Sequence, residues 1–212
     1  MADAFTPPPT HIYTHAAKAK TTLRHELRAR RRALNPTQQA QASAMLLRHL
    51  MQLPQFMRAR YVALYIANDG EIDPAPIALQ LWKMDKHCYL PVLRPGNSKA
   101  MWFVEYTPDA PLRKNRFGIP EPDFRQQHKL PATLLDVVLM PLVGFDRTGA
   151  RLGMGGGFYD STFAFKQKKQ GNKPYLIGLA HSCQEVDSLA TDNWDIPLFG
   201  VATEREIILS SH

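Results

Sequence analysis

The stretch from residue 135 to residue 160 constrains the fold most strongly, because it sets a buried strand, a tight loop and a helix start in succession. Residues 135–142 form a near-continuous apolar run, which is typical of a parallel strand covered on both faces. A glycine-rich segment follows, and a helix can begin at Phe158. Since other strand candidates alternate with helical segments, we expect an α/β domain with a largely parallel sheet.

Capping signals that contain proline mark where the expected helices begin. Asn35 is a good N-cap, Pro36 suits the first helical position, and Gln38 can close a capping box. Asp73-Pro74 repeats this signal. Helices are therefore expected over residues 18–34, 36 to about 52, 74 to about 84 and 158 to about 170.

Runs of β-branched and aromatic residues predict the strands. Asn68-Asp69-Gly70 is expected to form the turn after the first strand, and residues 113–128 a proline-bearing connection. The expected strands cover residues 61–67, 88–93, 101–106, 135–142, 175–180, 201–203 and 206–209.

The length of 212 residues and the apolar fraction of 44% fit one globular domain. Residues 1–17, which contain three consecutive prolines, are interpreted as a flexible arm ahead of a single domain over residues 18–212. We expect no membrane span, because no window approaches the roughly 18 uncharged apolar residues that a span needs. Cys88 and Cys183 form no C-x-x-C pair and are interpreted as reduced thiols of a cytoplasmic protein.

Positive charge is concentrated at the N-terminal end of the chain. The formal net charge is +7, and residues 1–32 hold seven Lys and Arg against two acids. A basic end of this kind attracts polyanions, whether nucleic acid, acidic lipid, nucleotide phosphates or a polycarboxylate substrate.

The glycine-rich segment has the outline of a phosphate cradle. Glycines let bare backbone N–H groups approach an anion at the carboxyl end of a strand. Arg151 can add a guanidinium fork, and Asp160 can serve as a Mg²⁺ ligand. A glycine cluster between strand and helix is also often only a tight turn. The segment matches neither G-x-x-x-x-G-K-[ST] nor the dinucleotide fingerprint, because Phe158 stands where the latter requires its last glycine.

The motif resembles that of the 5-formyltetrahydrofolate cyclo-ligase family, also called methenyltetrahydrofolate synthetase. The matching residues are Gly144-Phe-Asp146, Gly149 and Arg151-Leu-Gly-Met-Gly-Gly-Gly-Phe-Tyr-Asp160. Six further segments of this chain resemble segments that are typical of the family. They are Lys20-Thr-Thr-Leu-Arg24, Asn68-Asp-Gly-Glu-Ile72, Tyr89-Leu-Pro-Val92, Phe117-Gly-Ile-Pro-Glu-Pro122, Trp194-Asp195 and Thr203-Glu204. The resemblance runs from about residue 18 to the C-terminus.

The resemblance implies an α/β/α sandwich of three layers with a mostly parallel central sheet, like that of NagB, RpiA and the CoA transferases. It also implies conversion of 5-formyltetrahydrofolate and ATP into 5,10-methenyltetrahydrofolate, ADP and phosphate, with Mg²⁺. The γ-phosphoryl group would go to the formyl oxygen, and N10 would then close the ring. The family likeness favours a monomer that acts on small molecules, with the folate carrying one or several glutamates.

The resemblance also implies functional roles for individual residues, which are assigned from the matching positions in the family's motifs. The catalytic residues implied are Arg151, Lys20 and Arg24. The ATP-binding residues implied are Lys20, Thr21, Thr22, Leu23, Arg24, Arg151, Leu152, Gly153, Met154, Gly155, Gly156, Gly157, Phe158 and Tyr159. The substrate-binding residues implied are Ile66, Glu71, Phe117, Met154, Gly155, Gly156, Gly157 and Phe158. The Mg²⁺ ligands implied are Asp160 and Asp195.

The residues by themselves leave alternatives open for several of these roles. Glu71 could be a surface acid after a turn, and Phe117 a buried core residue. Asp195 could cap a helix or turn, and Asp146 could shape an Asx turn or bind metal. The arginines at 28, 30, 31 and 32 are assigned only to the general positive field and to attraction of a polyglutamate tail.

Two positions depart from the pattern of some family members, which carry cations where this chain has Met154 and Gly156. With fewer cations, more of the phosphate charge would have to be neutralised by Mg²⁺, the backbone N–H groups and the remaining basic residues.

Two other functions compete with the cyclo-ligase. A nucleic-acid-binding protein would explain the basic N-terminal helix but not the glycine motif, so no nucleic-acid partner is expected. A family relative could also bind nucleotide yet act on another substrate.

Overall fold

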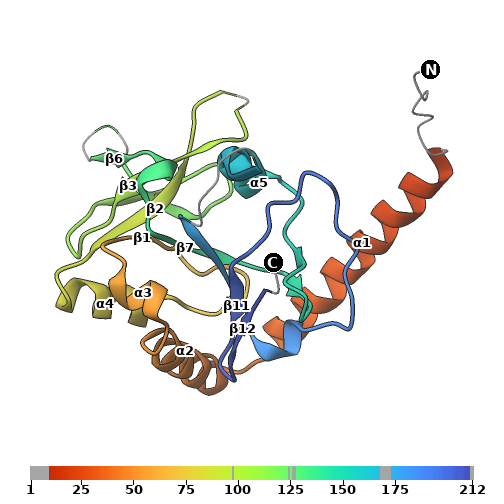
Figure 1. Cartoon of the computed structure of the whole chain (residues 1–212), viewed down its shortest axis with the longest axis horizontal. Coiled ribbons are helices and arrows are strands. Elements are labelled where there is room, and N and C mark those ends of the chain that lie inside the picture. Colours follow the sequence, from red (N-terminus) through yellow and green to blue (C-terminus); the bar gives the residue numbers. More distant parts are fainter. Residues whose placement is uncertain (1–9, 97, 124, 126–127, 168–172, 211–212) are drawn as a thin grey trace.

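The fold is built on one mixed sheet of eight strands. We describe it from a computed structural model, which covers residues 10–96, 98–123, 125, 128–167 and 173–210 (Figure 1). The strand order is β12-β11-β10-β7-β1-β2-β3-β6. The five strands from β11 to β2 are parallel, and β12, β3 and β6 join the edges antiparallel. The bounds are β1 Tyr61–Ala63, β2 His87–Leu93, β3 Met101–Glu105, β6 Lys129–Leu130, β7 Val137–Pro141, β10 Tyr175–Leu179, β11 Gly200–Ala202 and β12 Ile207–Leu209.

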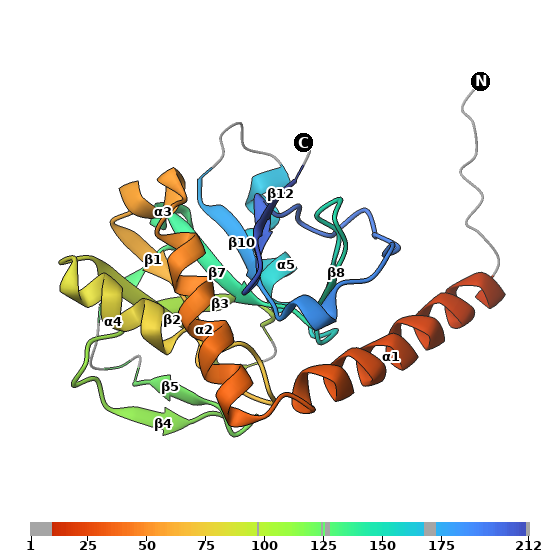
Figure 2. The same cartoon turned by 90° about the horizontal axis from the view of Figure 1, so that it is seen from below.

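Alternate side chains of the central strand β7 enter two different cores. Val137 and Leu139 belong to the core that also holds residues of α2 (Pro36–Leu50), α3 (Pro54–Arg58) and α4 (Ala75–Lys83). Val138 and Met140 belong to the other core, which includes Phe163 of α5 (Phe158–Phe163). Helices therefore cover both faces of the sheet, and the expected α/β architecture with a largely parallel sheet is confirmed (Figures 1 and 2).

The predicted capping box forms at the start of α2. The Gln38 N–H donates to Asn35 Oδ1, and the Asn35 N–H donates to Gln38 Oε1, each at 2.9 Å. The second predicted cap is displaced by one residue, because Pro74 and not Asp73 is the N-cap of α4, although Asp73 Oδ1 accepts a hydrogen bond from the Ala75 N–H at 2.9 Å. Both helices thus begin within a residue or two of the expected position because a side chain satisfies a free backbone N–H.

Several element predictions need correction. Strand β1 is shorter than the expected 61–67, because only Tyr61–Ala63 pairs with β2 and β7 before the chain turns into the site. The connection at 113–128 contains a hairpin of β4 (Leu112–Lys114) and β5 (Pro120–Pro122). A second unexpected hairpin joins β8 (Gly144–Phe145) to β9 (Arg151–Leu152).

The N-terminal helix α1 spans Thr10–Arg32 and so begins inside the segment expected to be an arm. Residues 1–9 of that predicted arm, and residues 168–170 at the end of the predicted fourth helix, lie outside the described residues. In Figures 1 and 2 the first part of α1 projects away from the body of the protein. Across the described part of the chain, no helix is long and apolar enough to cross a membrane.

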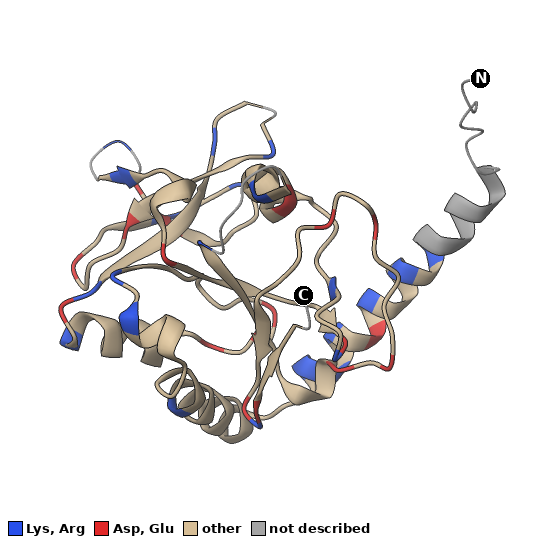
Figure 3. Ribbon diagram, viewed as in Figure 1, with Lys and Arg blue, Asp and Glu red and all other residues tan. Residues whose placement is uncertain are grey.

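The second half of α1 docks through a small apolar cluster of its own. Leu27 is fully buried against Val143 and Leu152, and Leu23 packs beside it one turn earlier. This places the same face of α1 against the β8–β9 hairpin and the start of the glycine-rich segment. Figure 3 shows that Lys and Arg recur along the described part of this helix.

Candidate functional site

Helix α1 meets the glycine-rich segment through Arg24. Its Nε donates to the Gly153 carbonyl at 2.8 Å, and the guanidinium carbon would lie 3.5 Å from a Cβ placed on Gly155. Lys20 stands one helical turn before Arg24, and its Nζ contacts Asp192 Oδ2 at 2.6 Å. The two cations expected to bind phosphates therefore share one face of α1, and only Arg24 touches the glycine segment directly.

Arg151 and Asp160 form a tight pair on the other side of this segment. Arg151 Nη2 lies 2.5 Å from Asp160 Oδ1, and it also donates to the Ile196 carbonyl at 3.2 Å. The Ile196 N–H donates to the same Asp160 oxygen at 3.2 Å. Arg151 Nε is buried and has no hydrogen-bond partner among the described residues. A buried N–H without an acceptor is costly, whereas the charge of the same guanidinium is already balanced by Asp160.

The predicted Mg²⁺ ligands are held by the same loop. Asp195 Oδ2 accepts a hydrogen bond from the Asp192 N–H at 2.8 Å, and Asp160 contacts the backbone of the next residue, Ile196. Among the described residues, the second oxygen of each carboxylate has no hydrogen bond. No group of three His, Cys, Asp or Glu side chains that could hold a metal occurs in the described ranges. Two carboxylates can hold Mg²⁺ only if phosphates and water complete its octahedron.

The conformation of the loop depends on glycine at two positions. Gly155 has φ of +89° and Gly157 has φ of +69°, in the left-handed region where a side chain is strained. Gly157 is the N-cap of α5 and has no side chain to accept from the first N–H groups of that helix. Four of the five residues from Gly153 to Gly157 are glycines, so this segment presents mostly backbone; its role as a phosphate cradle stays a prediction.

Asp146 has a structural role, which settles the alternative left open for it. Its Oδ1 accepts from the Thr148 N–H, the Thr148 hydroxyl and the Ala150 N–H, and its Oδ2 accepts from the Leu189 N–H. Since it is also almost fully buried, Asp146 shapes the β8–β9 turn and is not free to bind metal.

The turn that carries Glu71 is clamped by α1. Arg31 is completely buried, and it donates to the Asp69 carboxylate at 3.0 Å and to the Leu142 carbonyl at 3.1 Å. Arg28 contacts the same Asp69 carboxylate at 2.7 Å, and so does Arg32. The expectation that these three arginines supply only a general field is therefore wrong, because they fix one acid.

Glu71 lies in this clamped turn with only 13% of its side chain exposed. Its carboxylate accepts from the Asn68 N–H at 3.1 Å and lies 3.6 Å from Arg31. Burial raises the pKa of Glu71, although the Arg31 charge partly opposes that rise. The surface-acid alternative is therefore wrong. Ile66, half-buried at the edge of the core, precedes the turn.

Two aromatic rings mark the open side of the glycine segment. Phe117 is 56% exposed, which contradicts the core alternative, and its ring meets that of Phe158 edge-on with centroids 6.2 Å apart. The ring of Tyr159 stacks with that of Phe163, with centroids 6.4 Å apart. Burial and the nearby Glu71 charge raise the pKa of Tyr159. Phe117 thus lies beside Phe158, and the Glu71 charge lies near Tyr159.

Some predicted ATP-binding residues stand apart from the segment. Leu23 and Leu152 belong to the apolar cluster under α1. Thr21 and Thr22 are exposed on α1, and the Thr22 hydroxyl donates to the Lys18 carbonyl of its own helix. Met154 is 57% exposed beside the loop, which leaves its thioether open to a ligand.

Sequence reasoning missed three residues that organise the site. Asp192 pairs with Lys20 over 172 positions, and Asp69 gathers the arginines of α1. The buried Arg31 was indistinguishable from its exposed basic neighbours. The one available signal was its spacing, because Arg31 lies four positions after Leu27 and hence on the buried face of the helix.

The comparisons with known proteins agree on one family. The sequence model of the 5-formyltetrahydrofolate cyclo-ligase family matches residues 16–204. The chain is 43% identical to a 5-formyltetrahydrofolate cyclo-ligase of Haemophilus influenzae over 180 residues, which are 84% of this chain and 94% of that protein. It is 42% identical to the enzyme of the same name from Escherichia coli K12, with 85% and 98% covered.

Solved structures support the same assignment. The NMR structure of Aquifex aeolicus 5,10-methenyltetrahydrofolate synthetase superposes with a TM-score of 0.76 at 29% identity, and covers 91% of this chain and 93% of that one. The 5,10-methenyltetrahydrofolate synthetase of Mycoplasma pneumoniae, at 21% identity and a TM-score of 0.68, shares the fold over 87% of this chain and 98% of its own. Together with the matched motif, these similarities show that the chain belongs to the 5-formyltetrahydrofolate cyclo-ligase family.

Proposed function

We propose that this protein converts 5-formyltetrahydrofolate to 5,10-methenyltetrahydrofolate with consumption of ATP and release of ADP and phosphate. The observation that carries the proposal is the pairing of two different half-sites around one loop. One half has Arg24, Arg151 and bare backbone, which suit phosphates. The other has a buried carboxylate, Glu71, and an exposed aromatic ring, Phe117, which suit a pterin.

ATP is proposed to bind where α1 meets the glycine segment. Arg24 already contacts the loop backbone, and the unpaired Nε of Arg151 can donate to a phosphate oxygen. Lys20 can exchange Asp192 for a phosphate, because its ion pair is partly exposed and such pairs are weak. The glycines between them admit the nucleotide close to backbone N–H groups.

The carboxylates of Asp160 and Asp195 are proposed to hold Mg²⁺, since each has an oxygen without a hydrogen bond to another described residue. Bound there, Mg²⁺ would neutralise charge on the nucleotide phosphates. Asp160 also orients Arg151 through the 2.5 Å contact, so this carboxylate has a second role that does not depend on metal.

The folate is proposed to lie across Phe158, with its pterin towards Glu71 and Ile66. A buried carboxylate whose pKa is raised can accept from, or share a proton with, the N–H groups of the pterin ring. Phe117 and Phe158 can cover the flat part of the ligand by stacking. This orientation brings the N5-formyl group near the loop that binds the phosphates.

The chemical difficulty is the poor electrophilicity of the formyl group, which is amide-like. Transfer of the γ-phosphoryl group from ATP to the formyl oxygen turns that oxygen into a leaving group. N10 then attacks the formyl carbon and gives up its proton to solvent or to the leaving phosphate, and phosphate departs with the oxygen. The protein contributes by positioning both ligands and by stabilising charge with Arg24, Arg151 and Lys20. We also expect the enzyme to act as a monomer in the cytoplasm, without a nucleic-acid partner.

The test is direct. Purified protein with Mg-ATP and 5-formyltetrahydrofolate should develop the near-ultraviolet absorbance of the methenyl product. Asp160→Ala should abolish this turnover and leave circular dichroism unchanged. Asp187→Ala is the matched control, because Asp187 is an exposed acid outside the contacts described above.

Three results would contradict the proposal. Near-normal turnover by Asp160→Ala would exclude its metal role. Nucleotide binding without folate-dependent ATP hydrolysis would indicate a different substrate. No product together with tight, salt-sensitive RNA binding would indicate a nucleic-acid-binding protein.

A further inference from the structure

Trp194 is a large apolar residue to which the proposed function gives no role. It is 64% exposed, which is more than Phe117 or Met154 beside the glycine segment. Within the part of the chain that the structure describes, its indole stacks on no other ring and pairs with no cation. Since single exposed apolar residues are common on protein surfaces, exposure alone assigns no role, and the surroundings of the ring have to decide.

The turn that carries Trp194 is held at both ends. The Asp195 N–H donates to the Asp192 carbonyl at 2.9 Å, and the Asp192 N–H donates to Asp195 Oδ2 at 2.8 Å. Gln167 Nε2 donates to the carbonyl of Asn193, the residue before Trp194, at 3.3 Å. A ring on a turn whose backbone is already fixed can bind a ligand with little further ordering.

The same turn contacts the residues proposed to bind the phosphates. Asp192 Oδ2 lies 2.6 Å from Lys20 Nζ, and the Ile196 carbonyl accepts from Arg151 Nη2 at 3.2 Å. Trp194 stands between these two contacts in the sequence. Because only the ribose separates the base of a nucleotide from its phosphates, a ring at this point is in place to meet the base when the phosphates are bound.

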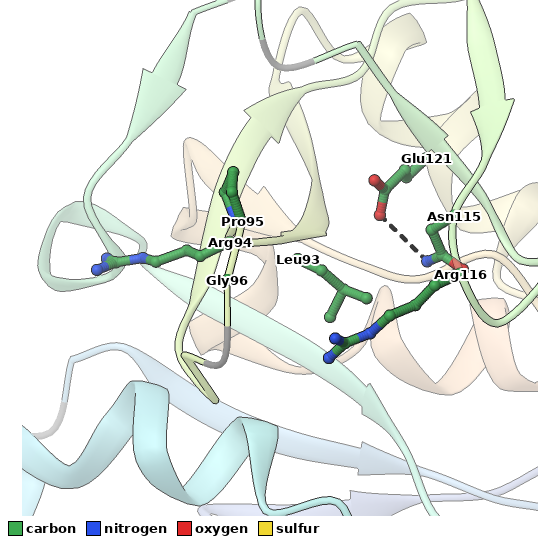
Figure 4. A pocket seen from close by; sticks show the side chains of 7 residues that line it. All are labelled: Leu93, Arg94, Pro95, Gly96, Asn115, Arg116 and Glu121. Atoms are coloured by element: carbon green, nitrogen blue, oxygen red, sulfur yellow. Dashed lines mark hydrogen bonds between the residues drawn. The ribbon is translucent and has the colours of Figure 1, made fainter.

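A cavity near the aromatic end of the site offers no such surface. It encloses about 230 Å³ between residues 93–96 on one side and Asn115, Arg116 and Glu121 on the other. None of the residues that line it is aromatic, and Figure 4 shows Arg116 pointing across it.

The choice of an aromatic surface for the base is narrow. Of the Phe, Tyr and Trp side chains that the structure describes, only Phe117 and Trp194 are exposed. Phe117 lies beside Phe158, where the folate is proposed to bind. Trp194 is therefore the exposed ring that remains for the nucleotide.

We infer that Trp194 stacks on the base of the nucleotide and gives the enzyme a preference for purine over pyrimidine nucleotides. This inference rests on the proposed function, in which the phosphates bind near Arg24 and Arg151. The two-ring face of a purine covers more of the indole than the single ring of a pyrimidine does, so it removes more apolar surface from water. Trp194 determines specificity in this way and takes no part in phosphoryl transfer.

The main experiment compares a non-hydrolysable ATP analogue with inorganic tripolyphosphate, which carries the phosphates without the base. Both are titrated with Mg²⁺ present, by isothermal titration calorimetry. Trp194→Leu should weaken binding of the analogue about tenfold and leave the affinity for tripolyphosphate at the wild-type value. Trp194→Phe should restore most of the lost affinity, because phenylalanine also stacks. In turnover assays, Trp194→Leu should raise the KM for ATP, reduce the ratio of the KM for UTP to that for ATP, and leave kcat near wild type.

The indole supplies a second readout that does not depend on turnover. The other two tryptophans are already engaged, because Trp82 Nε1 donates to the Tyr106 carbonyl at 2.9 Å and the Lys129 ammonium lies 4.3 Å from the centre of the Trp102 ring. The analogue should therefore quench the fluorescence of the wild type through Trp194. This change should be absent in Trp194→Phe and with tripolyphosphate, and should persist in the control Trp102→Phe.

A second control is Leu79→Ala, which removes a 55% exposed apolar side chain from α4 and should bind both ligands like the wild type. Equal affinity of Trp194→Leu and wild type for the analogue would overturn the inference. An equal loss of affinity for tripolyphosphate would also overturn it, because the ring would then act through the shape of the loop. Nucleotide binding that depends on Trp194 without any folate product would refute the proposed function alone. Binding of neither ligand to the wild type would refute both.

Discussion

Replacement of Asp69 by Asn tests whether the clamp between α1 and the Glu71 turn stabilises the fold. Asp69 has φ of +56°, a conformation that Asn tolerates, so the backbone need not change. The substitution removes the charge that three arginines share and keeps one acceptor oxygen. The completely buried Arg31 then retains only Glu71, at 3.6 Å, as a charged partner.

The expected cost follows from the exposure of each arginine. A charge-assisted hydrogen bond to buried Arg31 contributes about 1.5–3 kcal/mol. The bonds from Arg28 and Arg32, whose side chains are 26% and 52% exposed, contribute about 0.2–1 kcal/mol each. Asp69→Asn should therefore lower the free energy of unfolding by about 2–5 kcal/mol.

The loss should depend on pH. Burial opposes ionisation of Asp69, but hydrogen bonds from Arg28, Arg32 and Arg31 outweigh it and hold the pKa below its usual value of 3.8. A carboxylate with a lowered pKa stabilises the fold above that usual value, and the benefit disappears as the pH falls through the folded pKa. The difference between wild type and Asp69→Asn should be constant near neutrality and shrink below pH 3.8.

Urea denaturation followed by tryptophan fluorescence at several pH values measures both effects. Arg31→Met/Asp69→Asn should cost less than the sum of the two single changes, because neither partner is then left charged and buried. A loss below about 0.5 kcal/mol at neutral pH, which is the range of ordinary surface substitutions, would refute the reasoning.

Two further changes separate ligand contacts from stability. Phe117→Ala should leave the melting temperature unchanged, because the ring is 56% exposed. It should weaken folate binding by the roughly 0.5–1.5 kcal/mol of one aromatic stack, and Phe117→Trp should restore folate binding. A large loss of stability in Phe117→Ala would contradict the exposed position. Gly157→Ala should destabilise the fold by about 1–2 kcal/mol, because Gly157 has a φ of +69°, and it should raise the KM for ATP. Gly153→Ala should leave thermal stability near wild type, because a Cβ added at Gly153 has no other atom within 4 Å. Equal melting temperatures for the two glycine variants would show that the loop is not constrained as described.

Secondary-structure elements that are determined by neighbouring residues were predicted correctly from the sequence. The Asn35–Gln38 box and the apolar run that became β7 depend on neighbouring residues, and both formed as predicted. The β4–β5 hairpin was missed because its strands lack apolar alternation, and all three residues of β4 are exposed. The predicted range of strand β1 was too long, because pairing with its neighbours, and not its β-branched composition, determines where the strand ends.

Predicting the site had a different limit. The motif indicated which residues gather around the loop, and the structure brings Arg24, Arg151 and Asp160 together with it. The partners of the cations could not be predicted, because ion pairs such as Lys20–Asp192 join positions far apart in sequence. For Arg31 the one local signal was its position four residues after the buried Leu27, and that spacing does not reveal which acid the arginine binds.

The loop around residue 192 contacts α1 through Lys20 and the glycine-rich segment through Arg151. The proposed binding surface therefore combines residues from both ends of the sequence. During synthesis, α1 and most of the sheet emerge long before Asp192, Asp195 and Ile196 exist. Local structure in the first half can form early, but the contacts that close the proposed nucleotide site span most of the sequence and must come last. We therefore expect this site to be completed only after residues 192–196 are made, and a product truncated before residue 192 should be unable to bind ATP however well its sheet has formed.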